Sequence, residues 1–438
     1  MSTTQTAAPA ARPALRGGML YRLVWKWHFL AALYVLPFML ILSISGGIYL
    51  YKPQIEEVIY ADRLNVEATG TPLPITEQIA AVKAEYGLKR LRMITDPLDA
   101  NRSTLIEFND ADNTRSYAWV NPYTAEVLAV TPRDKTLMQM VKKFHGELLG
   151  GPFGTKFVEL AAQWAIVMMV TGVILWWPRG NRNLKDAVSL PKSPGRAWWR
   201  ETHLFTGMLA AVLITPLLIS GLPWTDVWGG ALSQIQKQTG QETVSLRFGG
   251  QKPNSTASEG TTIPVEQVVA LAVAQGLVAP IEVKPPRKPD AAYWVRSASR
   301  IRADQTELLV DQYSGKILKR IEFSENPIIS KTVSYGISLH QGELFGLPNL
   351  LLNTLAAVLG FTLALSGFIA WWKRRPAGEL GVPSAPDARL GWGYGVAILG
   401  MMILLPLMGA SLLIALLLDW LLFKRLGWFK GADVQPAE

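Results

Sequence analysis

Residues 27–51 read WHFLAALYVLPFMLILSISGGIYLY, and this stretch decides the class of fold. Its apolar run from Phe29 to Tyr51 is 23 residues long, whereas about 20 apolar residues suffice to cross the hydrocarbon core of a bilayer. A cleaved signal peptide has an apolar core of only about 7–15 residues, so we interpret the run as an uncleaved signal anchor. Similar runs recur along the chain. The sequence therefore predicts a polytopic α-helical membrane protein that resides in a lipid bilayer.

The distribution of lysine and arginine predicts the orientation of the spans. Basic residues gather before the first span, within residues 178–202, at Lys373–Arg375 and at Lys424–Arg425. Basic loops stay on the cytoplasmic side of a membrane, so we expect a cytoplasmic N-terminus and two long polar regions on the other side. The expected organisation is a disordered cytoplasmic tail (1–20), a first span (21–51), a first outward α+β module (52–144), a second span (145–177), a basic cytoplasmic loop (178–202), a third span (203–223), a second outward module (224–339), a fourth span (340–372), a cytoplasmic loop (373–390), a helical hairpin or one long helix (391–423) and a cytoplasmic tail (424–438).

Composition excludes several functional classes. The chain has no cysteine, which excludes disulfides, thiolate catalysis, iron–sulfur clusters and haem attached through a CxxCH motif. The formal net charge is +9, but the basic residues lie beside apolar runs. Such a placement indicates membrane topology rather than nucleic-acid binding, so no nucleic-acid partner is expected.

The chain repeats itself. The two outward regions end in similar stretches, WVNPYTAEVLAV (119–130) and LLVDQYSGKILKR (308–320), whose alternating apolar residues around a turn predict β-hairpins. A similar motif follows each hairpin, KFHGELLGGP (143–152) after the first and SLHQGELFGLP (338–348) after the second. We therefore expect an internal duplication in which each half consists of a helix, an α+β module and a second helix.

All four histidines of the chain occupy matched positions in this repeat. A Ser-Gly dipeptide follows His28 and His203 at +17 and +18, and a Trp-Trp pair follows His145 and His340 at +31 and +32. Each histidine therefore opens one of the repeated spans, the first two at the cytoplasmic face and the last two at the outer face. A two-fold arrangement of the halves would bring His28 to His203 and His145 to His340.

Paired histidines on facing helices suit haem iron. A neutral imidazole nitrogen is a good axial ligand, and two imidazoles fill both axial positions, which favours electron transfer over oxygen binding. Zinc is an alternative at the outer pair, where Glu147 and Glu343 could add ligands, but it leaves the inner pair unexplained. A proton relay would need carboxylates within the spans, and the first four spans have essentially none.

The stretches WHFLAALYVLPFMLILSISGGIYLY, FHGELLGG, VILWWPR and SLHQGELFG resemble the PepSY-associated transmembrane family, and the hairpins resemble PepSY modules, over about residues 20–425. That family includes inner-membrane ferric-siderophore reductases of the ferrioxamine and pyoverdine type. The resemblance implies a bacterial inner-membrane protein with two haem b groups, the inner one held by His28 and His203 and the outer one by His145 and His340. It implies no catalytic residue beyond these ligands.

The same resemblance implies that electrons pass outward to a ferric siderophore in the periplasm, which releases iron as Fe(II). No flavoprotein domain is fused to the chain, so the implied electron donor is a separate flavoprotein or a quinol. Three alternatives stay open. They are a membrane-anchored PepSY regulator of a peptidase without a cofactor, a cytochrome b electron carrier with another acceptor, and a permease, which would need broken helices and polar groups at mid-membrane.

Overall fold

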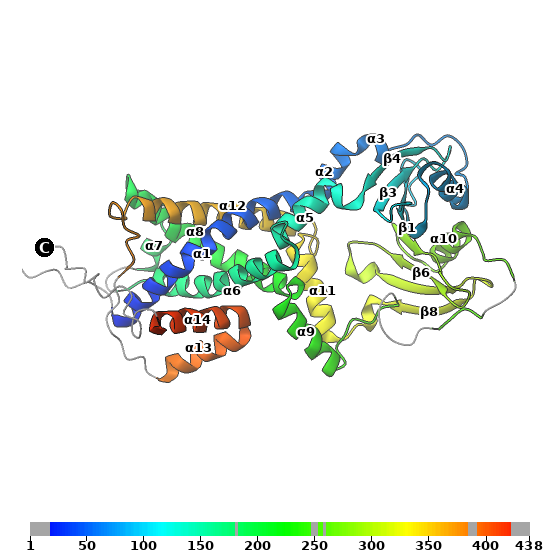
Figure 1. The fold of residues 1–438 in the computed structure, drawn as a ribbon. Coiled ribbons are helices and arrows are strands. Elements are labelled where there is room, and N and C mark those ends of the chain that lie inside the picture. The colour runs from blue at the N-terminus through cyan, green and yellow to red at the C-terminus, as the bar shows by residue number, and fades with distance from the viewer. Residues whose placement is uncertain (1–17, 180–182, 247–252, 257–259, 384–391, 422–438) are drawn as a thin grey trace, which may run out of the picture.

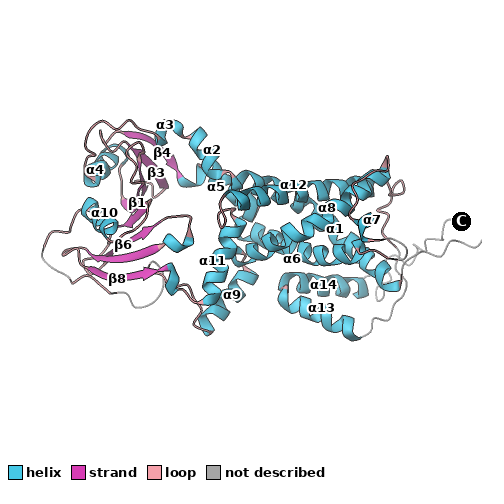
Figure 2. Cartoon of the chain, turned by 180° about the vertical axis from the view of Figure 1, so that it is seen from behind, coloured by secondary structure: helices cyan, strands magenta, loops and turns pink. Residues whose placement is uncertain are grey.

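The computed structural model describes residues 18–179, 183–246, 253–256, 260–383 and 392–421. Most of the predicted N-terminal tail (1–20) and the whole predicted C-terminal tail (424–438) lie outside these residues. Within them the protein has two parts, a bundle of long helices and, at one end of the bundle, a β-sheet with small helices (Figure 1). Figure 2 shows the same division from behind, with every strand at the sheet end.

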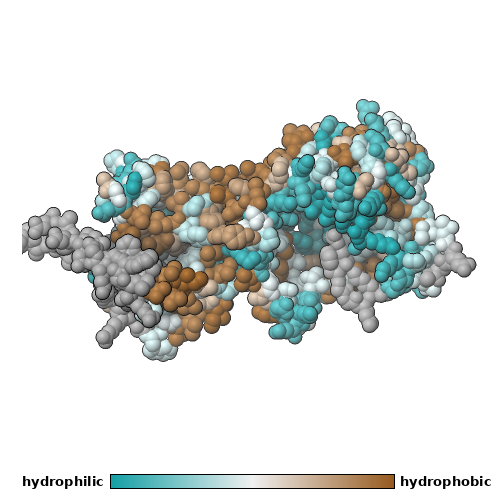
Figure 3. All heavy atoms as spheres, viewed as in Figure 1, coloured by the Kyte–Doolittle hydropathy of each residue, from teal (hydrophilic) through white to brown (hydrophobic). Residues whose placement is uncertain are grey.

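The helical part is a four-helix bundle built from α1 (Met19–Leu50), α6 (Gly151–Trp176), α8 (Arg196–Gly221) and α12 (Leu347–Trp372). Helices α1 and α8 each pack against both α6 and α12. All four are long and apolar enough to cross a membrane, since 26 residues of helix rise about 39 Å. Apolar residues cover the visible face of the bundle, and polar residues gather at the sheet end (Figure 3). The prediction of a multi-pass membrane protein is confirmed.

The sheet end is a single sheet, to which each of the two expected α+β modules contributes four strands. Its order is β4-β3-β2-β1-β5-β6-β7-β8, and the antiparallel pair β1–β5 joins the two four-stranded halves. An unpaired edge strand exposes its backbone polar groups, and this pairing covers one such edge on each half. The strands are β1 (Arg90–Asp96), β2 (Thr104–Asn109), β3 (Arg115–Val120), β4 (Val127–Pro132), β5 (Ile281–Lys284), β6 (Ala292–Ser297), β7 (Thr306–Asp311) and β8 (Ile317–Glu322).

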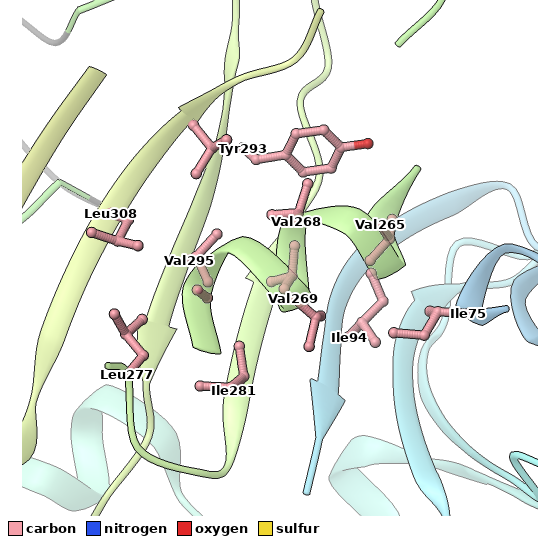
Figure 4. Packing of buried hydrophobic residues seen from close by; sticks show 13 residues of the cluster. Ile75, Ile94, Val265, Val268, Val269, Leu277, Ile281, Tyr293, Val295 and Leu308 are labelled. Carbon is pink, nitrogen blue, oxygen red and sulfur yellow. The ribbon is translucent and has the colours of Figure 1, made fainter. Parts of the chain in front are cut away.

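One face of the sheet carries the main core of this part. Helices α4 (Ile75–Tyr86) and α10 (Val265–Ala274) lie on that face, and their apolar side chains meet those of the central strands in a cluster that crosses the β1–β5 junction (Figure 4). Ile94 and Val283, which are paired across the junction, are both fully buried. The two halves of the sheet therefore share one core.

The hairpins β3–β4 and β7–β8 match in detail. Each has a register shift at the same place, after Trp119 and after Leu309. Each turn ends in a residue with left-handed backbone, Ala125 at φ 56° and Gly315 at φ 71°. The first copy therefore carries a strained alanine where the second has glycine.

Short helices link the sheet to the bundle, and a further pair follows the fourth span. The links are α2 (Lys52–Ile59), α3 (Ala61–Leu64), α5 (Leu137–Glu147), α9 (Val227–Gln238) and α11 (Ile328–His340). Helix α7 (Leu184–Ala187) lies between α6 and α8, at the end of the bundle away from the sheet (Figure 1). The 3-10 turns are η1 (Arg133–Lys135), η2 (Leu222–Trp224), η3 (Arg302–Asp304) and η4 (Phe323–Glu325).

The C-terminal segment forms a helical hairpin instead of one long helix, with α13 (Trp392–Leu404) and α14 (Pro406–Asp419) side by side (Figures 1 and 2). Helices of 13 and 14 residues rise only about 20 Å, so neither crosses a bilayer alone, and the two spans expected here are shorter than full spans. Residues 422–423 of the expected segment lie outside the described residues.

Candidate functional site: two histidine pairs

The bundle holds the four histidines in two pairs, one at each end. His28 of α1 and His203 of α8 form the remote pair, at the end away from the sheet. His145 and His340 form the sheet-side pair. The sequence thus paired the histidines correctly.

The sheet-side histidines do not open the spans, contrary to the sequence-based expectation. His145 lies in the last turn of α5, and His340 is the last residue of α11. The spans α6 and α12 begin only at Gly151 and Leu347. A left-handed turn intervenes, formed by Leu148 at φ 49° and Leu149 at φ 59° in the first half and by glycines in the second. Two left-handed leucines cost about 1–2 kcal/mol each, so this turn is strained beside the site.

The remote pair faces a large apolar cavity. His28 and His203 both line this cavity of about 820 Å³, together with aliphatic, methionine and aromatic side chains of all four bundle helices. The Nδ1 atom of His28 lies 2.9 Å from Oγ1 of Thr171 on α6. That of His203 lies 3.0 Å from the carbonyl oxygen of Leu363 on α12. Each ring is therefore tied to a neighbouring helix by Nδ1.

The sheet-side pair is close enough for both rings to serve one metal ion. The ring centroids of His145 and His340 are 6.4 Å apart, with an angle of 70° between the ring planes. A histidine nitrogen binds a transition metal at about 2 Å, so two imidazoles on opposite sides of one ion have centroids about 6 Å apart. Nδ1 of His145 is 3.0 Å from Ser45 Oγ, and Nδ1 of His340 is 2.9 Å from the Leu217 carbonyl oxygen.

These hydrogen bonds fix the tautomer of the rings. A carbonyl oxygen only accepts, so His203 and His340 carry their proton on Nδ1. The hydroxyls of Thr171 and Ser45 donate to main-chain carbonyls of their own helices, at 2.9 and 2.7 Å, and so they accept from His28 and His145. All four rings therefore keep Nε2 as the nitrogen with the free lone pair, which is the arrangement that metal-bound histidines show.

A glycine on a neighbouring helix makes room for each imidazole. A Cβ at Gly46 would lie 3.0 Å from His145 Cε1, and one at Gly221 3.2 Å from His340 Cε1. At the remote pair the corresponding glycines are Gly172, 3.4 Å from His28 Cε1, and Gly367, 2.9 Å from His203 Nδ1. All four glycines recur at fixed offsets in the sequence, since Gly46 and Gly221 follow His28 and His203 at +18, and Gly172 and Gly367 follow His145 and His340 at +27.

Three arginines line the cavity of the remote pair: Arg196, Arg200 and Arg374. Arg374 stacks on Trp25, with its guanidinium carbon 5.0 Å from the ring centroid. Burial, and then repulsion by Arg196, lower the pKa of Arg374. Among the described residues no carboxylate forms an ion pair with any of the three. The cavity therefore combines an apolar interior with cations suited to an acidic group.

The sequence indicates only some of the residues that surround the histidines. Arg374 belongs to a basic cluster that we assigned to topology, and nothing local indicates that it turns into the cavity. Thr171 does carry a signal, since a hydroxyl residue precedes each of the recurring glycines.

A polar layer separates the sheet-side pair from the sheet. Arg302 donates from Nε to Ser338 Oγ at 2.7 Å, two residues before His340. Burial lowers the pKa of Arg302. Arg300 lies 3.7 Å from Glu343. Cationic and hydrogen-bonding groups therefore lie beside the pair on the side that faces the sheet.

The expected zinc alternative finds no support in this geometry. Within the described part of the chain, which includes all four histidines, no three His, Cys, Asp or Glu side chains converge to hold a metal ion. A structural zinc site at the sheet-side pair would need further ligands near the two histidines, and among the described residues Glu147 and Glu343 do not form such a group with them.

One span does contain a buried carboxylate, contrary to the expectation for residues 145–177. Glu159 of α6 is fully buried and accepts hydrogen bonds from the backbone N–H groups of Val227 and Trp228, at 2.9 and 2.8 Å. These are the free amides at the start of α9. Gln163 donates to Glu159 and accepts from the amide of Met408 in α14, both at 3.0 Å. The pair therefore satisfies helix ends at membrane depth.

A family model described as the PepSY-associated TM region matches residues 25–374, or 350 of the 438 residues. The match covers the bundle, the sheet and all four histidines, and it ends before the α13–α14 hairpin. No curated protein matches the chain.

Proposed function

Since the chain belongs to the PepSY-associated transmembrane family, we propose that it is an inner-membrane oxidoreductase that holds two haem b groups and reduces ferric siderophores. Electrons enter from the cytoplasmic side, at His28 and His203, and leave at His145 and His340 on the periplasmic side. The donor is a separate flavoprotein or a quinol.

The observation that carries this proposal is that all four histidines have the same environment and the same expected protonation. They are all the histidines in the chain, each is tied through Nδ1, each is packed on a glycine, and they stand in two pairs at the ends of one bundle. A histidine that only fills space has no reason to keep Nε2 free in every case. Paired, oriented and neutral imidazoles are what a bis-histidine haem site needs.

The chain's own residues have simple tasks in this function. The bound haem supplies reversible one-electron chemistry. His28, His203, His145 and His340 offer their Nε2 lone pairs, and apolar side chains of the bundle exclude water. Arg196, Arg200 and Arg374 are placed to neutralise the acidic edge of a haem at the remote pair.

The sites lie at opposite ends of the same helices. Gly46, which packs on His145, follows His28 by 18 residues on α1, a rise of about 27 Å. The bundle therefore spaces two electron-carrying sites across the membrane. The polar layer between bundle and sheet is where the acceptor approaches the sheet-side pair. Siderophores hold Fe(III) through oxygen donors, and the lower charge of Fe(II) weakens that hold, so one electron releases the metal without an acid–base group.

The first test is a reduced-minus-oxidised absorbance spectrum of the purified protein with pyridine haemochrome quantitation. We expect two b-type haems per chain, loss of one in His28→Ala or His203→Ala, and loss of the other in His145→Ala or His340→Ala. Gln341→Ala, next to His340, is the matched control and should retain both. Reduction of ferric siderophores by the pre-reduced protein follows, and it should fail in all four histidine variants.

A colourless protein from haem-replete cells would overturn the proposal and would favour a membrane-anchored regulator of a peptidase. A two-haem protein that ignores every ferric siderophore would leave a cytochrome b carrier with another acceptor.

A further inference from the structure

Each of the four histidines meets a dipeptide made of a hydroxyl residue and glycine. The dipeptides are Thr171-Gly172 for His28, Ser45-Gly46 for His145, Ser366-Gly367 for His203 and Ser220-Gly221 for His340. The glycine makes room for the ring, as described above. The hydroxyl residue lies beside Nδ1 or beside the carbonyl that Nδ1 contacts.

The two halves of the chain use this hydroxyl differently. In the first half it is the hydrogen-bond partner itself, with Thr171 at 2.9 Å from His28 and Ser45 at 3.0 Å from His145. In the second half Nδ1 donates to a main-chain carbonyl instead. His340 is 2.9 Å from the Leu217 carbonyl and 3.3 Å from Ser220 Oγ.

His203 follows the second pattern. It donates to the Leu363 carbonyl at 3.0 Å, and Ser366 donates to that same carbonyl at 3.1 Å. Each pair therefore contains one histidine tied to a hydroxyl and one tied to a carbonyl.

We propose that Thr171 and Ser45 are positioning residues that set the reduction potentials of the remote and the sheet-side site independently, by accepting a hydrogen bond from Nδ1–H of one ligand in each. This inference rests on the proposed function and assigns it two residues that do not touch the iron.

The physical basis is the hydrogen bond on the far nitrogen of a metal-bound imidazole. An acceptor at Nδ1 makes Nε2 a stronger donor and fixes the ring orientation. A stronger donor favours the oxidised iron, so the bond lowers the reduction potential. Ser45 is 3% exposed, so water does not readily replace its hydroxyl, and its removal leaves the His145 N–H without its partner. Removal of Ser220 does not have this effect, because the Leu217 carbonyl stays with His340.

The experiment is a spectroelectrochemical titration of the full-length protein with both haems bound. Ser45→Ala should raise the potential of the sheet-side haem alone, by a shift of about tenfold in its reduction equilibrium, or about 59 mV for one electron. Thr171→Val, which keeps the shape of threonine, should raise the potential of the remote haem alone. Thr171→Ser, which keeps the hydroxyl, should restore it. Ser220→Ala is the matched control, and both potentials should stay at the wild-type values.

The outcomes separate this inference from the function on which it rests. Two haems per chain with unchanged potentials in Ser45→Ala and Thr171→Val would overturn the inference and leave the proposed function intact. Equal shifts in Ser45→Ala and Ser220→Ala would also overturn it, since they would indicate a packing effect. If Ser45→Ala does not fold, the potentials of Thr171→Val and Thr171→Ser test the inference by themselves. A colourless wild-type protein would overturn both proposals.

Discussion

Replacing Gly46 with alanine tests the ring-on-glycine packing at the sheet-side pair, and Gly47 provides a control one residue away. A Cβ at Gly46 would lie 3.0 Å from His145 Cε1, whereas one at Gly47 would lie 3.6 Å from the Cβ of Ala357, which is ordinary contact. Because ordinary contact begins at 3.4 Å, the His145 ring must move by about 0.4 Å to admit the methyl group. A binding site tolerates a displacement of its side chains of about 0.5 Å, so this shift of the His145 ring comes close to that limit.

We expect Gly47→Ala to raise the free energy of unfolding and Gly46→Ala to leave it unchanged or lower it. Glycine to alanine in a helix interior stabilises by about 1 kcal/mol, and Gly47→Ala should show most of that gain. Gly46→Ala has the same gain but adds overpacking of about 1–3 kcal/mol, so it should lie roughly 1–3 kcal/mol below Gly47→Ala.

Thermal unfolding of both variants in detergent, followed by circular dichroism, measures this difference. On the proposed function, the absorbance spectrum should also show a perturbed sheet-side haem in Gly46→Ala alone. Equal stabilisation of both variants, with identical spectra, would refute the argument that Gly46 is required by the His145 ring.

Glu159→Ala leaves two amides of α9 and Gln163 without a buried acceptor, so we expect a loss of about 2–4 kcal/mol, with Glu159→Gln losing less; hydrogen exchange at the start of α9 checks this. Ala125→Gly should stabilise the sheet by about 1 kcal/mol because it relieves a left-handed alanine, and Gly315→Ala should destabilise it by a similar amount, as denaturant melts would show. Hydrogen bonds from Arg102 lower the pKa of Glu57, so this pair stabilises the fold above the ordinary carboxyl pKa, and the contribution is lost as the pH falls through the lowered value. Glu57→Gln should therefore reduce the loss of stability on the acid side of a melting-temperature profile.

The sequence was informative where the physics is local or a matter of length. An apolar run such as residues 29–51 is long enough to cross a bilayer whatever surrounds it. A turn such as Asn-Pro-Tyr-Thr between alternating apolar residues specifies a hairpin by its own backbone preferences. The same dipeptides follow corresponding histidines at the same spacing in both halves of the chain. This was enough to predict which histidines pair, because equal spacings along a helix correspond to equal distances along its axis. The haem, the acceptor and the orientation remain predictions.

The sequence was misleading where a short segment depends on what it packs against. Leu148 and Leu149 take left-handed backbone although neither is glycine, so their residue types do not predict that α5 ends there, while Gly150, Gly151 and Pro152 do indicate a break before α6. The sequence gives no local signal for the role of Glu159, because its partners are amides at the start of a helix 68 residues away.

By itself the sequence determined the first four spans, the hairpins and the pairing of the histidines, since each follows from hydrophobic length, turn chemistry or periodicity along one segment. The tertiary structure alone decided that β1 pairs with β5, that Arg374 turns into the cavity beside His28, and that Ser45 and Thr171 accept hydrogen bonds from the imidazoles of His145 and His28. These contacts join residues far apart in the chain, and their free energy depends on desolvation and close packing that exist only after the helices and strands have come together.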